Sequence, residues 1–379
     1  MAVTIALVKE TVAGERRVGL DPATVDKLVQ RDVRVVMERG AGALARYPDD
    51  RYGGAEIVDD AAAALGEADI LVTVLPPTVE QIDALPEGAV TVGFTQHDRH
   101  PDRVARLRDR RITALSFELI PRITRAQTMD ALSSQGTITG YKGAVIAAEL
   151  SGRLFPMMTT AAGTIRPAQI LVIGAGVAGL QAIATAKRLG AQVEAYDIRA
   201  AAREQVESLG ARLIDTGVDA TSEGGYAREL SEEEKAQQAD VLAERIARAD
   251  AVIATAGVPG RPAPKIVTAA MVEGMKPGAV LVDLRAENGG NCELTKPGET
   301  IEHHGILIAG PDNVPSLSAI HASEMYARNV LALINPILGE DGVHVDLDDE
   351  VYAACALTHD GTIRHEETRR QVEGKGGEG

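Results

Sequence analysis

The sequence predicts an α/β protein with two Rossmann-like, doubly wound domains and a cleft between them. Short β-rich runs alternate with helical patterns over residues 1–118, and a second alternating series starts at residue 169. The middle runs of the first series are apolar throughout, which is typical of parallel strands covered by helices on both faces. In the second series, one run leads directly into the glycine-rich segment of residues 174–179. Strands that alternate with helices in this way form a parallel sheet.

The first series begins at the N-terminus. Its helical segments start with polar residues and carry apolar residues three or four positions apart, which favours amphipathic helices. The predicted strands are residues 4–10, 33–39, 69–76, 89–94 and 112–118, and the predicted helices are residues 21–31, 59–68 and 100–110.

The second series has strands and helices of the same kind. Ser231 is the predicted N-cap of one helix, and Glu234 is placed for a capping box. The predicted strands are residues 169–176, 192–198, 249–257, 278–284 and 305–310, and the predicted helices are residues 177–191 and 231–249.

The domain boundaries follow from the remaining segments. Helices near residues 126–152 and 316–334 are expected to bridge the two domains, whereas residues 342–363 have β character and no place in the second sheet. We therefore assign residues 1–128 and 319–379 to a discontinuous first domain. Residues 129–318 form the nucleotide-binding domain. The tail from residue 369 lacks apolar anchors, so we expect it to be disordered.

Composition limits the classes of partner. The chain has 379 residues, 45% of them hydrophobic, and a net charge of −16. This length is sufficient for two domains with hydrophobic cores. An acidic surface repels phosphate backbones and anionic membranes, so we expect no nucleic-acid partner. A nucleotide remains compatible with this charge, because backbone N–H groups can bind its phosphates.

Nothing in the sequence predicts membrane insertion or export. No apolar run approaches the roughly 18 residues of a membrane-spanning helix. The N-terminal apolar run is too short for a signal peptide. Cys292 and Cys355 are far apart and form no CxxC pair, so we expect neither a disulfide framework nor a thiolate metal site. These features favour a soluble, cytoplasmic protein.

The glycine-rich segment is the strongest local motif. Gly174, Gly176 and Gly179 form G-x-G-x-x-G directly after a predicted strand and at the start of a predicted helix. The first glycine permits a tight turn, the second lets the backbone approach a pyrophosphate, and the third allows helix and strand to pack closely. The alternative is a packing turn without a ligand.

The end of the next predicted strand indicates which dinucleotide binds. Asp197 lies about 20 residues beyond the glycines, where an acidic residue binds the adenosine ribose hydroxyls. A carboxylate there repels a 2′-phosphate, which favours NAD(H) over NADP(H). Arg199, two residues later, is the opposing signal, because a nearby arginine can accept that phosphate.

Three further segments are candidates for cofactor contact. Residues 255–264 follow a strand at its carboxyl end, where open α/β sheets bind ligands, although a plain connector is an equal alternative. Tyr226 follows two glycines in a long polar connection, which predicts either a lid or a surface loop. Asp283 and Glu287 are able to hold a metal or act as acid and base, but their position at a strand end favours hydrogen-bonding or turn roles. We expect no metal site.

Four polar side chains of different kinds precede residues 137–150, which have the pattern of an amphipathic helix. They are a cation, an amide, a carboxylate and a hydroxyl: Arg122, Gln127, Asp130 and Ser133. One interpretation is a capping cluster, with Asp130 or Ser133 as the N-cap. The cluster contains no histidine, the usual general acid or base. None of the eight histidines of the chain stands in a motif either.

Seven segments spread over nearly the whole chain carry a resemblance to a known family. They are RITRAQTMDALSSQ, GAGVAGLQAIATAKRLGAQVEAYDIRAA, EQVESLGA, GGYAREL, PGRPAPKIVT, ENGGNCEL and DNVPS. On these segments the chain resembles the NAD(H)-binding soluble component of proton-translocating nicotinamide nucleotide transhydrogenase.

The resemblance implies direct hydride transfer between NADH and NADP⁺ without a general acid or base. It places Arg122, Gln127, Asp130 and Ser133 in a loop around the nicotinamide, where they orient the reacting rings. The cofactor-binding set that it implies is Gly174, Gly176, Val177, Ala178, Gly179, Asp197, Ile198, Arg199, Tyr226, Ala256, Gly257, Pro264 and Glu287.

The resemblance also implies partners. The enzyme would be a Re/Si-specific, proton-translocating transhydrogenase, active only with a membrane-spanning subunit and an NADP(H)-binding subunit. The chain would be a homodimer, peripheral to the cytoplasmic membrane through those partners.

Two alternatives remain at this point. Alanine dehydrogenase shares the fold, and Arg17 stands where that family binds the substrate carboxylate. Leu75 and Phe94, however, occupy the places of its lysine and catalytic histidine, and Glu287 replaces its strand-end aspartate. The second alternative is a non-enzymatic NAD sensor, which the polar set around the nicotinamide argues against.

Overall fold

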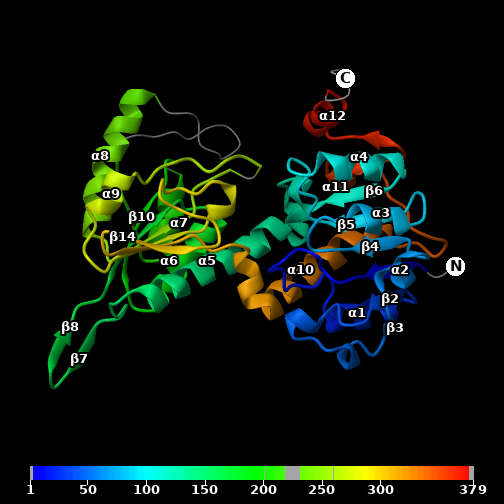
Figure 1. The fold of residues 1–379 in the computed structure, drawn as a ribbon, viewed down its shortest axis with the longest axis horizontal. Helices are drawn as coiled ribbons and strands as arrows, with labels where there is room; N and C mark the ends of the chain where they lie inside the picture. Colours follow the sequence, from blue (N-terminus) through cyan, green and yellow to red (C-terminus); the bar gives the residue numbers. More distant parts are fainter. Residues whose placement is uncertain (1–2, 200, 218–230, 259, 375–379) are drawn as a thin grey trace. The chain divides into compact units, whose positions relative to one another are not determined.

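The computed structural model describes residues 3–199, 201–217, 231–258 and 260–374. The chain forms two compact units, each built around its own sheet (Figure 1). Unit 1 consists of Met1–Gln135 and Ser316–Gly379, and unit 2 of Gly136–Pro315.

The sheet of unit 1 has eight strands in the order β17-β16-β6-β5-β4-β1-β2-β3. In this order, the strands from β6 to β3 all run parallel to one another. Strand β16 pairs antiparallel with β6, and β17 pairs antiparallel with β16 at the edge of the sheet. The strands are β1 (Thr4–Leu7), β2 (Arg34–Glu38), β3 (Glu56–Val58), β4 (Ile70–Val72), β5 (Val90–Gly93), β6 (Thr113–Ser116), β16 (Ala356–His359) and β17 (Thr362–Ile363).

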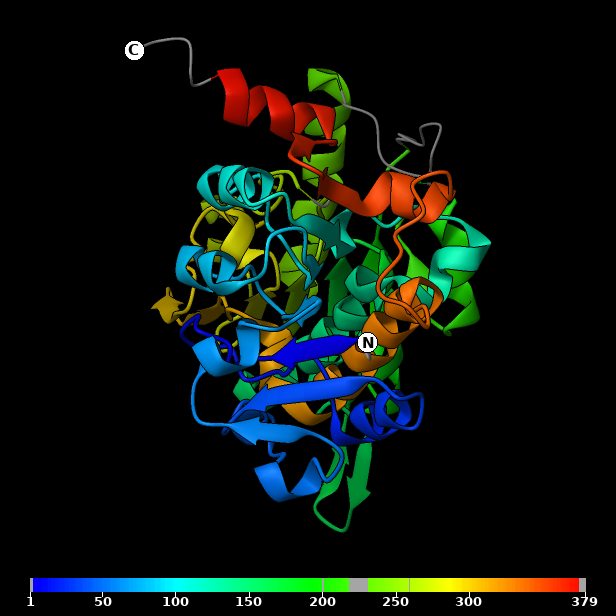
Figure 2. The same cartoon turned by 90° about the vertical axis from the view of Figure 1, so that its right-hand side faces the viewer.

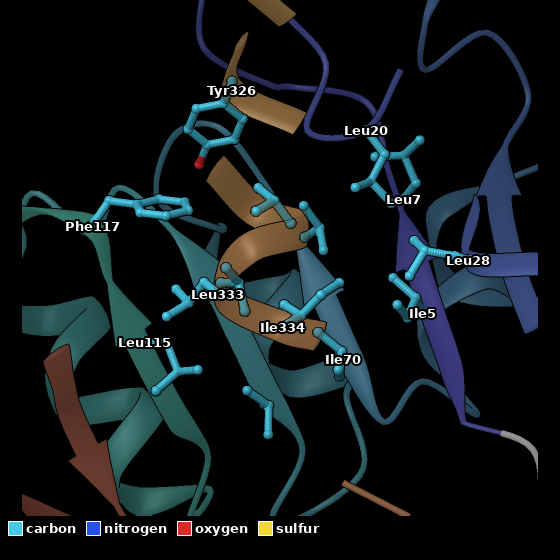
Figure 3. Close-up of a cluster of buried hydrophobic side chains, with 14 of the residues drawn as sticks. Ile5, Leu7, Leu20, Leu28, Ile70, Leu115, Phe117, Tyr326, Leu333 and Ile334 are labelled. Carbon is cyan, nitrogen blue, oxygen red and sulfur yellow. The ribbon is translucent and has the colours of Figure 1, made fainter. Parts of the chain in front are cut away.

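Helices cover both faces of this sheet. Ile5 and Leu7 of β1 enter one hydrophobic cluster and Ala6 enters another, as the two-residue period of a strand requires. Figure 3 shows the first cluster, to which Leu333 and Ile334 of the α10 helix also belong. The helices are α1 (Pro22–Val29), α2 (Ala61–Leu65), α3 (Val79–Ala84), α4 (Pro101–Asp109), α10 (Ala319–Ile334), α11 (Glu350–Cys355) and α12 (Glu366–Glu373).

Two sequence expectations for the C-terminal part of unit 1 are wrong. Within the segment expected to be β, residues 350–355 form helix α11, because the Asp349 side chain accepts a hydrogen bond from the Val351 N–H at 2.8 Å and caps the helix. The sequence predicts disorder from residue 369, yet α12 continues to residue 373 and packs against α4 and β17 (Figures 1 and 2).

The sheet of unit 2 has seven strands in the order β11-β10-β9-β12-β13-β15-β14, all parallel except β14. Strand order reverses at β9, which pairs with β10 on one side and β12 on the other. Such a switch point is where open α/β sheets bind ligands. The strands are β9 (Gln169–Ile173), β10 (Gln192–Tyr196), β11 (Arg212–Leu213), β12 (Ala251–Ala254), β13 (Val280–Asp283), β14 (Thr300–His303) and β15 (Ile306–Ala309).

The second sheet is also covered on both faces. Val172 of β9 packs in a cluster with α5, α6 and α7, and Ile173 packs in a cluster with α8 and α9. The predicted capping box is confirmed, since Ser231 and Glu234 exchange hydrogen bonds at the start of α8. The helices are α5 (Ala131–Leu150), α6 (Val177–Arg188), α7 (Ala202–Ser208), α8 (Glu232–Arg248) and α9 (Ala269–Glu273).

A two-stranded hairpin, separate from both large sheets, is not predicted from the sequence. It consists of β7 (Met158–Thr160) and β8 (Gly163–Ile165), and every residue of both strands is exposed. Within the described ranges, no helix combines the length and the apolar character that crossing a bilayer requires.

Candidate functional site

The turn after β9 requires glycine at two of its three motif positions. Gly174 has φ of +93°, and a Cβ there would lie 2.8 Å from Thr255 Oγ1. At Gly179 a Cβ would lie 1.8 Å from the Gly174 carbonyl oxygen. The Thr255 hydroxyl donates to that same oxygen at 2.9 Å, so the turn and the end of β12 are locked together. Only glycine fits the turn at these two positions.

The middle glycine is different. Gly176 caps helix α6 with φ of −77°, which any residue adopts. A Cβ at Gly176 would meet no atom within 4 Å among the described residues. Val177, the first residue of α6, is 44% exposed. The helix N-terminus is therefore open at this point, and its backbone N–H groups suit a phosphate.

Helix α5 packs closely against this turn. A Cβ at Gly140 would lie 2.0 Å from the Ala178 carbonyl oxygen, and one at Gly143 would lie 2.5 Å from Leu284 Cδ1. Both glycines therefore let α5 lie directly on the first turn of α6 and on the segment after β13. Helix α5 therefore supports the glycine turn of residues 174–179, in addition to the support from the end of β12.

The carboxylate of Asp197 directly follows β10 and is fully engaged. It accepts hydrogen bonds from the Ala175 N–H at 2.7 Å and from the backbone and guanidinium of Arg199 at 2.9–3.0 Å. Burial opposes its charge, but these hydrogen bonds outweigh burial and hold the pKa of Asp197 below its usual range. Ile198 between them is half-buried and packs in the core.

The Asp197–Arg199 pairing affects the choice between NAD(H) and NADP(H), because a free Arg199 would be able to bind a 2′-phosphate. The Arg199 guanidinium is held by the very carboxylate that would reject a 2′-phosphate. It is therefore not presented as a phosphate-binding cation in this state, and the choice of NAD(H) over NADP(H) is the one that the local charges favour.

Asn291 is a site residue that sequence reasoning missed. It is fully buried, and its Nδ2 donates to the carbonyl oxygens of Ala256 and Pro264 at 2.8 and 2.9 Å. It thereby holds the two ends of the loop of residues 255–264 by hydrogen bonds. Within this loop, Gly257 lies close to Arg285, since a Cβ at Gly257 would be 2.7 Å from Arg285 Nε. No sequence motif marks this asparagine; its role depends on where the two loops meet.

Asp283, the last residue of β13, and Glu287, four residues later, both accept hydrogen bonds. Asp283 is fully buried and accepts hydrogen bonds from the Cys292 N–H at 2.9 Å and the Thr295 hydroxyl at 2.7 Å. The exposed Glu287 accepts from the Asn313 N–H. The expected hydrogen-bonding role of the pair is therefore confirmed. Tyr226 lies outside the described residues.

In unit 1, two of the four polar residues, Asp130 and Ser133, are brought together at the start of α5. The Asp130 carboxylate accepts from the Ser133 N–H at 2.9 Å and from the Ser133 hydroxyl at 2.5 Å. The first of these is an N-cap hydrogen bond, so Asp130 caps α5 as the capping interpretation expects. The side chains of Arg122 and Gln127 are exposed on the preceding loop, where residues 124–129 form a 3₁₀ turn.

The loop of residues 122–133 is anchored by residues far away in the sequence. Arg125 forms a two-pronged ion pair with Asp349 at 2.6 and 2.7 Å. Asn329 of α10 donates to the Thr128 carbonyl oxygen at 2.8 Å and accepts from the Ser134 hydroxyl at 2.7 Å. The backbone is therefore fixed on both sides of Gln127.

Leu75 and Phe94, the residues expected in place of the alanine dehydrogenase lysine and histidine, carry no group that transfers a proton. Leu75 packs against the core of unit 1, and Phe94 lies 5.7 Å from Tyr326, ring centre to ring centre. The Arg17 side chain is 5% exposed, and its guanidinium donates to Glu15 at 2.6 and 2.9 Å. Burial alone would raise the pKa of Glu15, but Arg17 lowers it to about 2, so the two form a buried ion pair.

Comparisons with known proteins agree with this geometry. The model for the N-terminal domain of alanine dehydrogenase/PNT matches residues 6–139, and that for the C-terminal domain matches residues 143–366. The chain belongs to the alanine dehydrogenase/PNT family. Within this family it is 45% identical to an NAD(P) transhydrogenase subunit alpha component of Rhodospirillum rubrum, over 95% of this chain and 97% of that protein.

Solved structures lead to the same family. The crystal structure of transhydrogenase from Sinorhizobium meliloti superposes with a TM-score of 0.86 at 41% identity, covering 95% of this chain and 99% of that one. Alanine dehydrogenase of Bacillus subtilis is 27% identical over 97% of this chain and 94% of that protein. The predicted resemblance to transhydrogenase is confirmed, alanine dehydrogenase is a more distant relative, and these relatives support a role in NAD(P) transhydrogenase.

Proposed function

We propose that this chain is the NAD(H)-binding subunit of a Re/Si-specific, proton-translocating NAD(P) transhydrogenase. It exchanges hydride with NADP(H) held on a partner subunit and is active only with its partners, of which one spans the cytoplasmic membrane. The chain then lies on the cytoplasmic side, peripheral to the membrane. The observation that carries the proposal is the buried Asp197 carboxylate beside an open glycine turn. In addition, Leu75 and Phe94, the expected counterparts of the alanine dehydrogenase lysine and histidine, are apolar residues in or against the core of unit 1.

The nucleotide end of the site fits NAD(H). The open backbone at Gly176 leaves room for a pyrophosphate at the N-terminus of α6. Asp197 binds the adenosine ribose and repels a 2′-phosphate. The proposed contacts are Gly174, Gly176, Val177, Ala178, Gly179, Asp197, Ile198, Arg199, Tyr226, Ala256, Gly257, Pro264 and Glu287.

Ribose binding has a consequence for Arg199. A carboxylate has about four lone-pair sites, and Asp197 uses its oxygens on Ala175 and on three nitrogens of Arg199. The ribose hydroxyls therefore take the place of the two guanidinium hydrogen bonds. The Arg199 guanidinium is released from the carboxylate when the cofactor binds, so Arg199 contacts the cofactor through its backbone, and the selection against NADPH depends on the charge of Asp197.

The four polar residues of unit 1 orient the nicotinamide. When bound, NADH supplies the hydride, and the acceptor is a second nicotinamide, so no proton transfer accompanies the step. What the chain must provide is orientation of the reacting carbon. Arg122 and Gln127 are exposed on a backbone that Asn329 and Asp349 anchor. Asp130 and Ser133 add a hydrogen-bonded pair at the start of α5.

The test combines the purified chain with an NADP(H)-binding transhydrogenase component and follows hydride transfer from NADH to an NADP analogue. Transfer that depends on both proteins is expected. Turnover of NADH with pyruvate and ammonia by the chain alone would support alanine dehydrogenase instead. NADH binding without transfer to any partner component would favour the sensor.

The homodimer is supported by the exposed hairpin. Met157, Met158 and Ile165 at β7 and β8 are 66%, 41% and 49% exposed, and clustered exposed apolar side chains mark interaction surfaces. Mass measurement by light scattering is expected to give a dimer. Met158→Glu with Ile165→Glu should shift the mass toward a monomer, whereas the control Leu44→Glu, at an apolar residue 61% exposed outside the hairpin, should not.

A further inference from the structure

Three metal-ligating side chains meet at one edge of the sheet of unit 2. Glu273 is the last residue of α9, His303 is the last residue of the edge strand β14, and His304 begins the turn into β15. Figure 1 shows α9 and β14 in this region of the unit. None of the three belongs to the proposed NAD(H) contacts, and the sequence alone predicts no metal site.

The geometry of the cluster is compact. His303 Nε2 lies 3.1 Å from Glu273 Oε1. The two imidazole rings lie 4.5 Å apart between centres and are tilted by 32°. One ligand atom from each of the three residues lies within 4.8 Å of the other two, and among the described residues this is the one group of three or more potential ligands that does so.

The hairpin backbone holds the two imidazoles next to each other. His303 pairs with Ile306 across a two-residue turn, in which His304 and Gly305 have φ of +51° and +74°. Two successive positive φ values are the mark of a type I′ turn, whose twist matches that of the strands. Histidine is one of the few side chains found in the left-handed region, and here it directs a second imidazole beside the first.

We propose that Glu273, His303 and His304 form a surface site for a divalent transition-metal ion of the Zn²⁺ class. Two imidazole nitrogens and one carboxylate oxygen suit Zn²⁺, Cu²⁺ or Ni²⁺, whereas Mg²⁺ and Ca²⁺ take oxygen ligands. Three protein ligands leave the fourth position of a tetrahedral Zn²⁺ ion to water.

The three side chains would need to move little to bind the ion. Ligand atoms around a tetrahedral Zn²⁺ lie about 3.4 Å apart, from metal–ligand distances of about 2.1 Å, and the present separations are at most 4.8 Å. The side chains of His303 and Glu273 are 31% and 46% exposed, so they are able to rotate. The bound ion would join α9 to the β14–β15 hairpin and so stabilise the edge of the sheet.

The test uses the full chain after dialysis against a chelator. Titration with Zn²⁺ by calorimetry, and with Co²⁺ by its visible absorption, is expected to show one tight equivalent. Zn²⁺ should also raise the melting temperature, because binding to the folded state alone stabilises it. His304→Asn keeps a residue that tolerates positive φ but removes the imidazole. It should weaken binding more than about tenfold, since even loss of an outer-shell partner costs that much.

His303→Gln and Glu273→Gln should weaken binding in the same way, which covers the case in which His304→Asn alters the turn. The matched control is His365→Gln, because His365 and His97 form another histidine pair, 5.1 Å apart. Binding that survives all three cluster variants, binding lost only with His365→Gln, or no Zn²⁺ binding by the unmodified chain would each overturn the proposal.

Discussion

The glycine turn of unit 2 and the loop of residues 122–133 of unit 1 each carry residues with a proposed role in function, yet the two segments are built in opposite ways. The turn presents backbone and has almost no steric freedom: a Cβ at Gly179 would lie 1.8 Å from a carbonyl oxygen. The loop presents side chains, and Arg122 and Gln127 are exposed. The loop is anchored by the Arg125–Asp349 ion pair and by Asn329.

The difference matches two separate tasks. Affinity for a dinucleotide comes from preformed backbone donors and a fixed carboxylate, whose own positions need not change when the ligand arrives. Orientation for hydride transfer depends on a few side chains placed within about 1 Å. Variants of the turn should therefore change binding or stability, and variants of the loop should change the rate.

The largest effect is expected within the turn. Gly179→Ala places a methyl group against the Gly174 carbonyl oxygen, so the turn must open, at a cost of about 3 kcal/mol or more. Thermal unfolding should show the loss. Gly176→Ala is the matched control, because its methyl group meets no atom of the described residues within 4 Å. It should keep the melting temperature and lose NADH affinity. Normal NADH binding by Gly176→Ala would mean that no phosphate approaches this backbone.

Gln127→Asn tests the loop. It shortens the amide by one methylene and keeps its chemistry, and a misplacement of about 1 Å is expected to cost on the order of 10²-fold in hydride-transfer rate. NADH affinity, measured by calorimetry, should change far less, because the lost interaction acts on the reacting geometry. An unchanged transfer rate would show that this exposed amide takes no part in orientation.

Asp197→Asn should weaken NADH binding by about 1–3 kcal/mol, the range for hydrogen bonds to a charged group, and should narrow the preference over NADPH. Arg199→Ala is the companion variant: it frees lone pairs of Asp197, so NADH should bind as tightly or more tightly. NADPH binding as tight as NADH binding by the unmodified chain would contradict the assignment.

The pH dependence of NADH binding follows from the same carboxylate. The pKa of Asp197 is lowered in the folded chain, so the charged form is present above the ordinary pKa and is lost only as the pH falls below it. Affinity should therefore stay flat between about pH 8 and about pH 5. Affinity that declines within this window would show that another group controls binding.

The smallest loss of hydride-transfer rate is expected at the helix cap. Asn is as good an N-cap as Asp, so Asp130→Asn should keep the start of α5 intact and leave the melting temperature nearly unchanged. The charge next to Ser133 is lost, and the hydride-transfer rate should fall roughly twofold to tenfold, or up to about 1.4 kcal/mol. If the rate is that of the unmodified chain, Asp130 is a cap and nothing more.

Features that depend on neighbours in the sequence were predictable. The glycine turn is one, because Gly174, Gly176 and Gly179 lie within a single strand-to-helix connection. The capping box of Ser231 and Glu234 is another, because its two hydrogen bonds join residues three positions apart. The strands around them were predictable because an apolar run buried on both faces has few alternatives.

Features that depend on distant partners were decided by the tertiary structure. The sequence shows Asn291 as an ordinary polar residue and does not give the partners of Asp283 or Arg17. The fold makes Asn291 a link between two loops, Asp283 an acceptor for Cys292 and Thr295, and Arg17 the partner of Glu15 in a buried ion pair. Residues 350–355 form a helix next to the Arg125–Asp349 pair, which joins positions 224 residues apart. His303 and Glu273 meet only because β14 folds back along the sheet beside α9. Local propensity contains no information on such pairs, since a hydrogen bond or ion pair forms between whichever groups the packed core brings within reach.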